Sequence, residues 1–203
     1  MIMNDLEKRM MNSRLRANNQ RKKLGPLLLK KSQLPPGLKF LEVGCGQGMG
    51  VDVLKNIFKA DEVFSFDLDP QQVNTARENL TKKNLMDGSV HMSVADAGKL
   101  PFKSGGFDGV LNFGIIHHCP DWRTAIAEIA RVLKPSGKFV FEEVFGKANK
   151  SFPLRYMFKH PKEGMFSYEE FCAELERNNL KLYDNHYCFY GYYILGVAEK
   201  IPG

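Results

Sequence analysis

Short apolar runs alternate with segments of helical periodicity over most of the chain. The runs have the length of buried strands, and the segments between them repeat apolar residues every three or four positions. This alternation is typical of a parallel sheet covered by helices. We therefore expect a doubly wound α/β fold with a seven-stranded sheet. The strands are predicted at 40–43, 63–66, 90–94, 107–113, 138–144, 181–189 and 192–199.

The same pattern predicts four helices and the residues that begin them. Three helix-starting signals stand in the sequence. The first is Asp69 followed by Pro70, the second is Asp121, and the third is Ser167 with Glu170 three residues later. The last two predicted strands flank Gly191, so we expect an antiparallel hairpin there in an otherwise mostly parallel sheet. The inward-facing helical positions are predicted to be Val51, Leu54, Phe58, Val73, Ala76, Leu80, Trp122, Ile126, Ile129, Leu133, Phe171 and Leu175.

Length and composition indicate one globular domain. The 203 residues are 43% hydrophobic and 26% charged, enough for one substantial core. No uncharged apolar run approaches the roughly 18 residues of a membrane helix, and both charge signs occur in the first ten residues, unlike a secretory signal. The four cysteines show no CxxC pairing. We expect a reduced, cytoplasmic protein without a bound metal.

The net charge of +6 is concentrated at the N-terminus. Residues 1–31 carry nine Lys or Arg against Asp5 and Glu7, whereas the remaining chain holds 20 basic and 21 acidic residues. We therefore divide the chain into a basic, helical leader or lid (1–37) and a main domain (38–203). The leader is consistent with a solvated helix face, a lid, a membrane-surface helix, an arm that touches RNA through residues 1–31, or a site for an acidic partner. The sequence leaves the oligomeric state open.

A glycine-rich stretch, FLEVGCGQGMG, follows the first predicted strand. Glycine adopts positive φ and lets another molecule approach the backbone closely. No Lys-Ser or Lys-Thr follows these glycines, which argues against a nucleoside triphosphate loop. A dinucleotide-binding fingerprint has the pattern GxGxxG. Counted from Gly44 and Gly46, its third glycine would fall at position 49, which is Met49, so the stretch does not match this fingerprint.

Acidic residues stand at the ends of the predicted strands around this turn. Glu42 precedes the glycines, Asp67 ends the second strand, and Asp96 follows the third. In a parallel sheet these strand ends share one edge, where ligands bind. Three acids facing a glycine turn would repel a pyrophosphate, but they suit a ligand with hydroxyls, amines or positive charge.

Five motifs in order resemble those of class I S-adenosylmethionine-dependent methyltransferases. They are LEVGCGQG, FDLDP, DAGKLPF, FDGVLNFGIIHH and RVLKPSG. The resemblance is dense over 38–145 and rests on topology alone for the last 35 residues. It implies a Rossmann-like fold and S-adenosyl-L-methionine as cofactor, with S-adenosyl-L-homocysteine as product.

The resemblance also implies roles for individual residues. The glycine turn would bend around the methionine part of the cofactor, Glu42 would meet its amino end, and Asp67 would accept both ribose hydroxyls. Leu68 would pack on the adenine, and Asp96 and Ala97 would bind its edge. The Asn112 carbonyl and Phe113 would lie where the chain runs beside the amino group and the sulfonium. The implied cofactor residues are Glu42, Gly44, Cys45, Gly46, Gly48, Asp67, Leu68, Asp96, Ala97, Asn112 and Phe113.

Three residues are candidates for acid–base chemistry. His117 and His118 follow the fourth strand, and histidine titrates near neutrality. Their alternative role is to cap or pack the helix that begins at Asp121. Glu143, rather than its neighbour Glu142, is expected to face the cleft. A base is needed only if the acceptor carries a proton that must leave.

The acceptor is expected to be a small molecule. An aromatic insertion at 146–166, which contains Phe152, Tyr156, Phe158 and Phe166, reads most simply as a small hydrophobic cap. Cys119 is expected to be structural, and NFGI at 112–115 departs from the Asn-Pro-Pro-aromatic signature of amino-methylating enzymes. The sequence therefore predicts methyl transfer to an O, N, S or C nucleophile. RNA or protein methylation, or a catalytically silent cofactor-binding subunit, are the alternatives.

Overall fold

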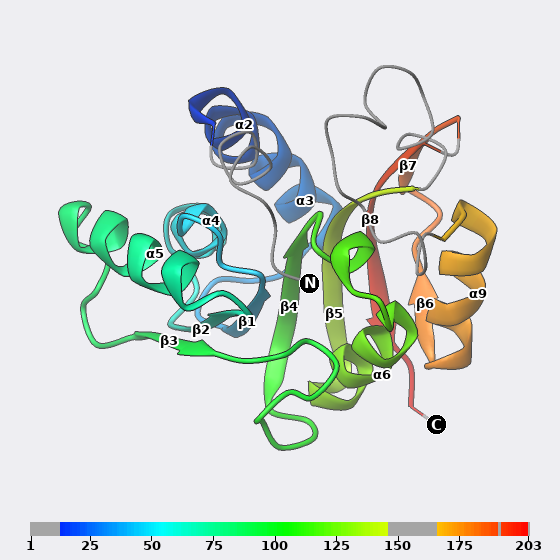
Figure 1. The fold of residues 1–203 in the computed structure, drawn as a ribbon. Helices are drawn as coiled ribbons and strands as arrows, with labels where there is room; N and C mark the ends of the chain where they lie inside the picture. Colours follow the sequence, from blue (N-terminus) through cyan, green and yellow to red (C-terminus); the bar gives the residue numbers. More distant parts are fainter. Residues whose placement is uncertain (1–12, 146–165, 191, 203) are drawn as a thin grey trace.

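The computed structural model describes residues 13–145, 166–190 and 192–202 (Figure 1). Within these ranges one twisted sheet has the strand order β3-β2-β1-β4-β5-β8, with β6 and β7 both pairing with β8. The first five strands are parallel, and β8 is antiparallel to β5, β6 and β7. The strands are β1 (Lys39–Val43), β2 (Glu62–Asp67), β3 (Val90–Val94), β4 (Phe107–Phe113), β5 (Leu133–Val144), β6 (Leu180–Leu182), β7 (Tyr187–Phe189) and β8 (Tyr193–Lys200).

The predicted fold class is confirmed, with two differences in detail. The single strand expected at 181–189 is divided into β6 and β7 by a turn in which the His186 N–H donates to the Tyr183 carbonyl at 3.2 Å. Because β6 and β7 pair with opposite ends of β8, the sheet remains seven positions wide. Leu133, expected to end a helix, instead begins β5.

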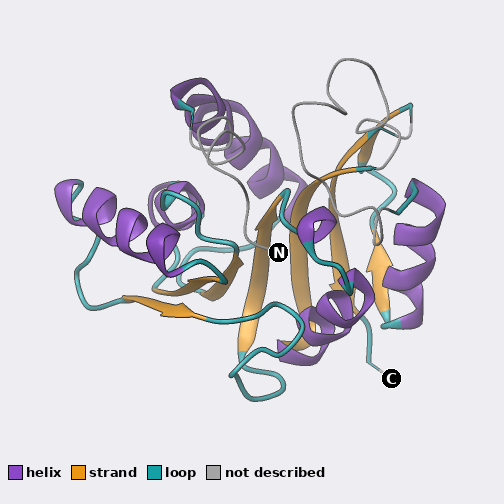
Figure 2. Cartoon of the chain, in the orientation of Figure 1, coloured by secondary structure: helices purple, strands orange, loops and turns teal. Residues whose placement is uncertain are grey.

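Helices cover both faces of the sheet (Figure 2). One face carries α2, η1, α3, α4 and α5, and the other carries α6 and α9. Side-chain alternation along each strand divides the core between the two faces. Phe40 of β1 packs with the α4 side and Leu41 with the α6 side. The helices are α2 (Arg14–Asn19), η1 (Gln20–Leu24), α3 (Gly25–Ser32), α4 (Met49–Asn56), α5 (Pro70–Lys82), η2 (Ile116–His118), α6 (Trp122–Val132) and α9 (Tyr168–Arg177).

The predicted helix starts are confirmed. Asp69 Oδ1 accepts from the Gln71 N–H at 2.9 Å, and Asp121 Oδ1 accepts from the Thr124 N–H at 3.2 Å. Ser167 and Glu170 form a reciprocal capping box at α9. These caps fix where the chain leaves the carboxyl edge of the sheet.

The basic leader is helical over residues 14–32 and packs on the sheet. Leu28 is fully buried, and Gly25 lies so close to α4 that a Cβ atom there would be 2.9 Å from both Val53 Cγ1 and Ile57 Cδ1. The leader is therefore attached to the α4 face. No helix in the described ranges is long and apolar enough to span a bilayer.

The predicted cap insertion lies outside the described residues except for Phe166. That residue was expected among the cap aromatics, but it is buried in the core. Its ring lies 4.4 Å from that of Trp122 and 5.4 Å from that of Phe171, centroid to centroid. Phe166 therefore anchors the start of α9 to α6.

Candidate active site

Two adjoining cavities open at the carboxyl edge of the parallel strands. The larger, of about 400 Å³, lies between the ends of β1, β2 and β3 and the start of α6. The smaller, of about 50 Å³, lies between the glycine turn and the leader helix. Gly44, Asp67 and Ile115 line both cavities. The volume of the larger cavity falls within the range of about 300–1,000 Å³ that is usual for small-molecule sites.

The glycine turn bends sharply between the two cavities. Gly44 has φ 80°, and a Cβ atom there would overlap the side chain of Ile115. The N–H groups of Gly44 and Cys45 both donate to the Phe66 carbonyl, at 3.0 and 2.8 Å. The turn is thereby attached to β2, and only a residue without a side chain fits at Gly44.

Asp67 lies at the junction of the cavities. Its Oδ2 accepts from the Gly46 N–H at 3.2 Å, and its Oδ1 accepts from the Asp69 N–H at 3.0 Å. Burial raises the pKa of this carboxyl, while the two backbone donors lower it. Because each carboxylate oxygen has a second lone pair, Asp67 is able to accept two further hydrogen bonds from a ligand.

Glu42 is buried at the back of the smaller cavity. Its Oε2 accepts from Ser65 Oγ at 2.5 Å, and its carboxyl group touches Gly50 at the start of α4. Burial, with the nearby charge of Asp67 adding to it, raises the pKa of Glu42 to about 8. A cation bound in this cavity would favour the ionised carboxylate.

Residues from three loops line the larger cavity. Leu68 is part of this lining and is about two fifths exposed, and Asp96 Oδ1 accepts from the Gly98 N–H at 2.8 Å. Ala97 forms part of the same wall. Asp69 was assigned a capping role only, but the structure gives it that role and also a place in the cavity wall.

The leader contributes two residues that the sequence analysis did not identify. Arg16 and Gln20 line the smaller cavity opposite the glycine turn. Arg16 Nη2 donates to the Phe113 carbonyl at 3.0 Å, and Arg16 Nη1 lies 3.9 Å from Glu142 Oε1. The inward face of the leader is formed by positions 20, 24 and 28, which are four residues apart. Extending this helical spacing one step back leads to Arg16, and this was the signal that the sequence offered.

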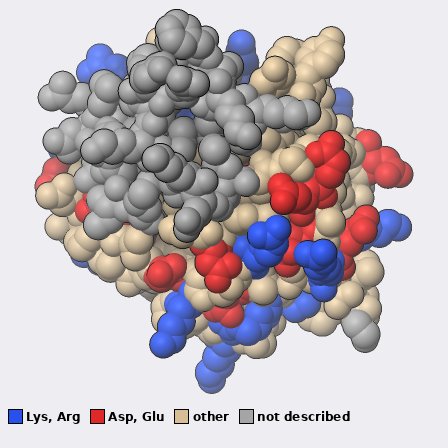
Figure 3. Space-filling model, turned by 45° about the vertical axis from the view of Figure 1, so that its right-hand side comes forward, with Lys and Arg blue, Asp and Glu red and all other residues tan. Residues whose placement is uncertain are grey.

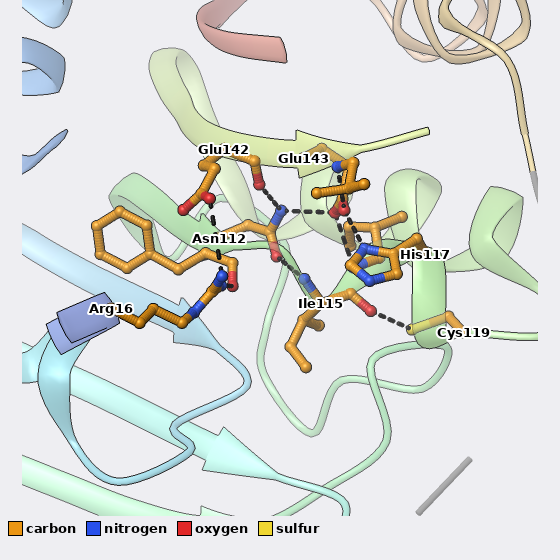
Figure 4. Close-up of polar contacts among 10 residues, drawn as sticks. Arg16, Asn112, Ile115, His117, Cys119, Glu142 and Glu143 are labelled. Carbon is orange, nitrogen blue, oxygen red and sulfur yellow. Dashed lines mark hydrogen bonds and ion pairs between the residues drawn. The ribbon is translucent and has the colours of Figure 1, made fainter. Parts of the chain in front are cut away.

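The two glutamates at the end of β5 point to opposite faces of the sheet (Figure 4). Glu142 faces Arg16, whereas Glu143 faces His117 and is fully buried. Glu143 Oε2 accepts from Asn112 Nδ2 at 3.0 Å and from the Ile116 N–H at 2.9 Å. Its Oε1 pairs with His117 Nδ1. The expectation that Glu143 faces the cleft is wrong, because its oxygens are engaged inside the protein.

The two histidines differ in their access to the cavities. His118 lines the larger cavity, whereas His117 is held by Glu143 and lines neither cavity. Their rings lie 4.1 Å apart, centroid to centroid. Neighbouring Cys119 lines the larger cavity, and burial raises the pKa of its thiol to about 12. Cys119 therefore remains a thiol near neutral pH.

Most of the cofactor residues implied by the sequence are brought together. Two do not line either cavity: Gly48, the residue before α4, and Asn112, whose side chain is buried. Asn112 Nδ2 donates to the Glu142 carbonyl at 3.1 Å, and its Oδ1 accepts from the Ile115 N–H at 3.0 Å. The Asn112 side chain therefore shapes the turn after β4.

Comparisons with known proteins agree with this arrangement. Residues 41–141 match the family model of the methyltransferase domain. Over 108 residues the chain is 38% identical to O-methyltransferase cnsE of Penicillium expansum, a match covering 53% of this chain and 38% of that protein. Over 123 residues it is 34% identical to the 2-methyl-6-phytyl-1,4-hydroquinone methyltransferase of Synechocystis sp., covering 61% of this chain and 37% of that protein. These matches span well under half the length of each relative.

A solved structure shares the fold over nearly the whole chain. It is that of a SAM dependent methyltransferase from Aquifex aeolicus, with a TM-score of 0.75 and 19% identity. The match covers 96% of this chain and 97% of that chain. The shared fold therefore extends beyond residues 41–141, which the family model matches.

Proposed function

Because the chain belongs to the class I S-adenosylmethionine-dependent methyltransferases, we propose that it transfers a methyl group from this cofactor to a small molecule. The observation that carries the proposal is the position of Asp67. Its carboxylate fixes the glycine turn and lies where the two cavities meet. One cavity would hold the adenosine part of the cofactor and the other its methionine part.

The residues around the junction match the chemistry of this cofactor. Asp67 retains acceptor capacity for two ribose hydroxyls, and Gly44 leaves room that a Cβ atom would fill. Leu68, Asp96 and Ala97 would bind the adenine. In the smaller cavity, Glu42 would face the amino group and Arg16 the carboxylate of the methionine part.

The cofactor supplies a methyl group on a positively charged sulfur, which a nucleophile attacks in line. The protein's contribution is to position the two reactants and to exclude water. We assign proton removal from the acceptor to His118, because it lines the larger cavity. Glu143 would act through His117 by fixing the turn that carries both histidines. Glu143 is therefore proposed as a positioning residue.

The acceptor is proposed to be a small molecule. The larger cavity has a volume of about 400 Å³, in the usual range for small-molecule sites, and its lining combines aliphatic side chains with aspartates and other polar groups. One relative is named for a phytyl hydroquinone, a small molecule with ionisable hydroxyls. An acceptor of that type would need the proton removal assigned to His118.

The cofactor site is tested by calorimetric titration with S-adenosylmethionine and S-adenosylhomocysteine. Asp67→Asn should weaken binding about 100-fold, because the NH₂ group that replaces one carboxylate oxygen can accept neither from its backbone N–H nor from a ribose hydroxyl. Asp87→Asn, which changes an exposed carboxyl before β3, is the control and should bind as the wild type does. Absence of binding to the wild-type chain would refute the proposal.

Turnover is tested by measuring S-adenosylhomocysteine release with a panel of phenols, fatty acids, amines and RNA. We expect activity with a small hydroxyl compound and a loss of about 100-fold in kcat for His118→Gln, with cofactor binding retained. Binding without turnover on any acceptor would favour the silent subunit. Turnover on RNA alone would assign the activity to a different acceptor class.

A further inference from the structure

The described leader carries charge of a single sign. Residues 13–32 contain seven Lys or Arg and no Asp or Glu. Elsewhere both signs are mixed, as on the face shown in Figure 3, where acidic and basic side chains lie next to one another. Two of the seven are half-buried and donate to backbone carbonyls: Arg16 to that of Phe113 and Lys31 to that of Asn185. The other five are exposed, and one of them, Arg21, has its Nε 3.8 Å from Asp52 Oδ1; the remaining four are Arg14, Lys22, Lys23 and Lys30.

Large apolar side chains are exposed on the leader and on the turn between β7 and β8. Leu15 of α2 is 83% exposed, although the opposite side of the leader is buried. At the turn between β7 and β8, Tyr190 is 80% exposed, and Tyr187 and Phe189 each expose about half of their surface. Tyr190 also has φ 47°, a conformation that bulky residues rarely adopt. Exposed apolar side chains that gather in one patch mark an interaction surface, in contrast to ones scattered singly.

The leader and the β7–β8 turn belong to the same end of the molecule. Arg16 reaches the carboxyl ends of β4 and β5 through the Phe113 carbonyl and Glu142. At the same edge, the Phe145 N–H donates to the Tyr192 carbonyl at 2.9 Å. In Figure 1, α2 and β7 both extend beyond the ends of these strands. The basic and the apolar residues thus flank the edge where the cavities open.

We propose that this surface docks the protein on an anionic lipid bilayer. We define it as the docking face, comprising Arg14, Leu15, Lys22 and Lys23 of the leader and Tyr187, Phe189 and Tyr190 of the turn. Basic side chains near a membrane are attracted by anionic headgroups, and Tyr, Phe and Leu partition into the interface beneath them. The cavities would then open toward the bilayer.

A bilayer fits the docking face better than RNA does. Both ligands are polyanionic, and aromatic rings stack on bases as well as entering lipid. Leu15 distinguishes them, because an aliphatic side chain gains little from bases but gains from leaving water in lipid. The proposal does not rest on methyl transfer, and its test uses no turnover.

The test is flotation of the full chain with vesicles of phosphatidylcholine containing 30% phosphatidylglycerol. The wild type should bind these vesicles and release at high salt, and it should bind pure phosphatidylcholine at least tenfold more weakly. Lys22→Gln with Lys23→Gln should weaken binding about 30-fold, since each basic residue contributes about fivefold. Lys103→Gln with Lys181→Gln removes the same charge from the opposite edge of the sheet and should change binding less than twofold.

The apolar part of the face is tested separately. Leu15→Gln with Tyr190→Asn should weaken vesicle binding about tenfold, and asparagine tolerates the positive φ at 190. Ile201→Gln, an exposed apolar side chain at the opposite edge, is the matched control. Unchanged melting temperatures show that each variant is folded. The proposal is overturned if wild type does not float, if paired variants and controls behave alike, or if tRNA binds and vesicles do not.

Discussion

Gly50 and Glu42 are in direct contact at the base of the smaller cavity. A Cβ atom at Gly50 would overlap Glu42 Oε1, and the same carboxyl group accepts from Ser65 Oγ. Backbone N–H groups of Gly50 and Val51 also lower the pKa of Glu42. The start of α4, the end of β1 and the middle of β2 are therefore joined through one buried carboxyl group.

Gly50→Ala is expected to lower the free energy of unfolding by about 2–3 kcal/mol. The added methyl group would overlap the Glu42 carboxyl group and has to displace it from its hydrogen bonds to Ser65 and to the start of α4. Urea denaturation measures the loss. Gly106→Ala is the control, because a Cβ atom there would meet the Lys103 carbonyl oxygen at 3.4 Å. Equal effects of the two substitutions would contradict the contact.

Glu42→Gln is expected to change how stability depends on pH. The pKa of Glu42 is about 8 in the folded protein and about 4.5 when the chain is unfolded. Its stabilising contribution is therefore fully present below pH 4.5, and it falls by up to about 1.4 kcal/mol per pH unit until pH 8. The Gln side chain cannot ionise. The free energy of unfolding of the variant, relative to that of the wild type, should therefore rise across this pH range and then remain constant. Parallel urea-unfolding curves against pH would contradict the raised pKa.

Arg16→Gln is expected to weaken cofactor binding about tenfold. The substitution removes the hydrogen bond to the Phe113 carbonyl and the cation that lines the smaller cavity. Calorimetric titration with S-adenosylmethionine provides the measurement. Arg14→Gln changes an exposed arginine two residues earlier and should leave the affinity within twofold of the wild-type value. A similar loss in both variants would mean that leader charge in general, and not Arg16, determines affinity.

Glu143→Gln is expected to lower the free energy of unfolding by about 2–4 kcal/mol. The carboxylate accepts from Asn112 Nδ2 and from the N–H groups of Ile116 and Val144. An amide places an NH₂ group against one of these buried donors, which then lacks an acceptor. Urea denaturation measures the loss.

Glu62→Gln is the matched control for this change. Glu62 is partly exposed and pairs with Lys39 at 2.8 Å. Removing such a surface charge pair should cost less than about 1 kcal/mol. If Glu143→Gln were as mild as the control, Glu143 would not be organising the turn after β4.

Local patterns were sufficient to predict the sheet and the helix starts. β3 and β4 occupy the predicted residues 90–94 and 107–113, because their apolar runs are bounded by turn-forming residues. Asp69, Asp121 and Ser167 cap helices as expected, since a cap depends only on residues two or three positions away. The split between β6 and β7 was missed, because both pair with β8 and an apolar run alone does not show a turn inside it.

The sequence by itself determined where most strands lie along the chain, the glycine turn, and the acids that end the strands around it. These follow from residue spacing, which the chain carries without any distant contact. Only the tertiary structure decided that Arg16 closes the smaller cavity, because its partners lie 97 and 126 positions away. It also decided that Glu142 faces the leader while Glu143 faces His117, since alternation separates the two side chains but does not say what packs on each face.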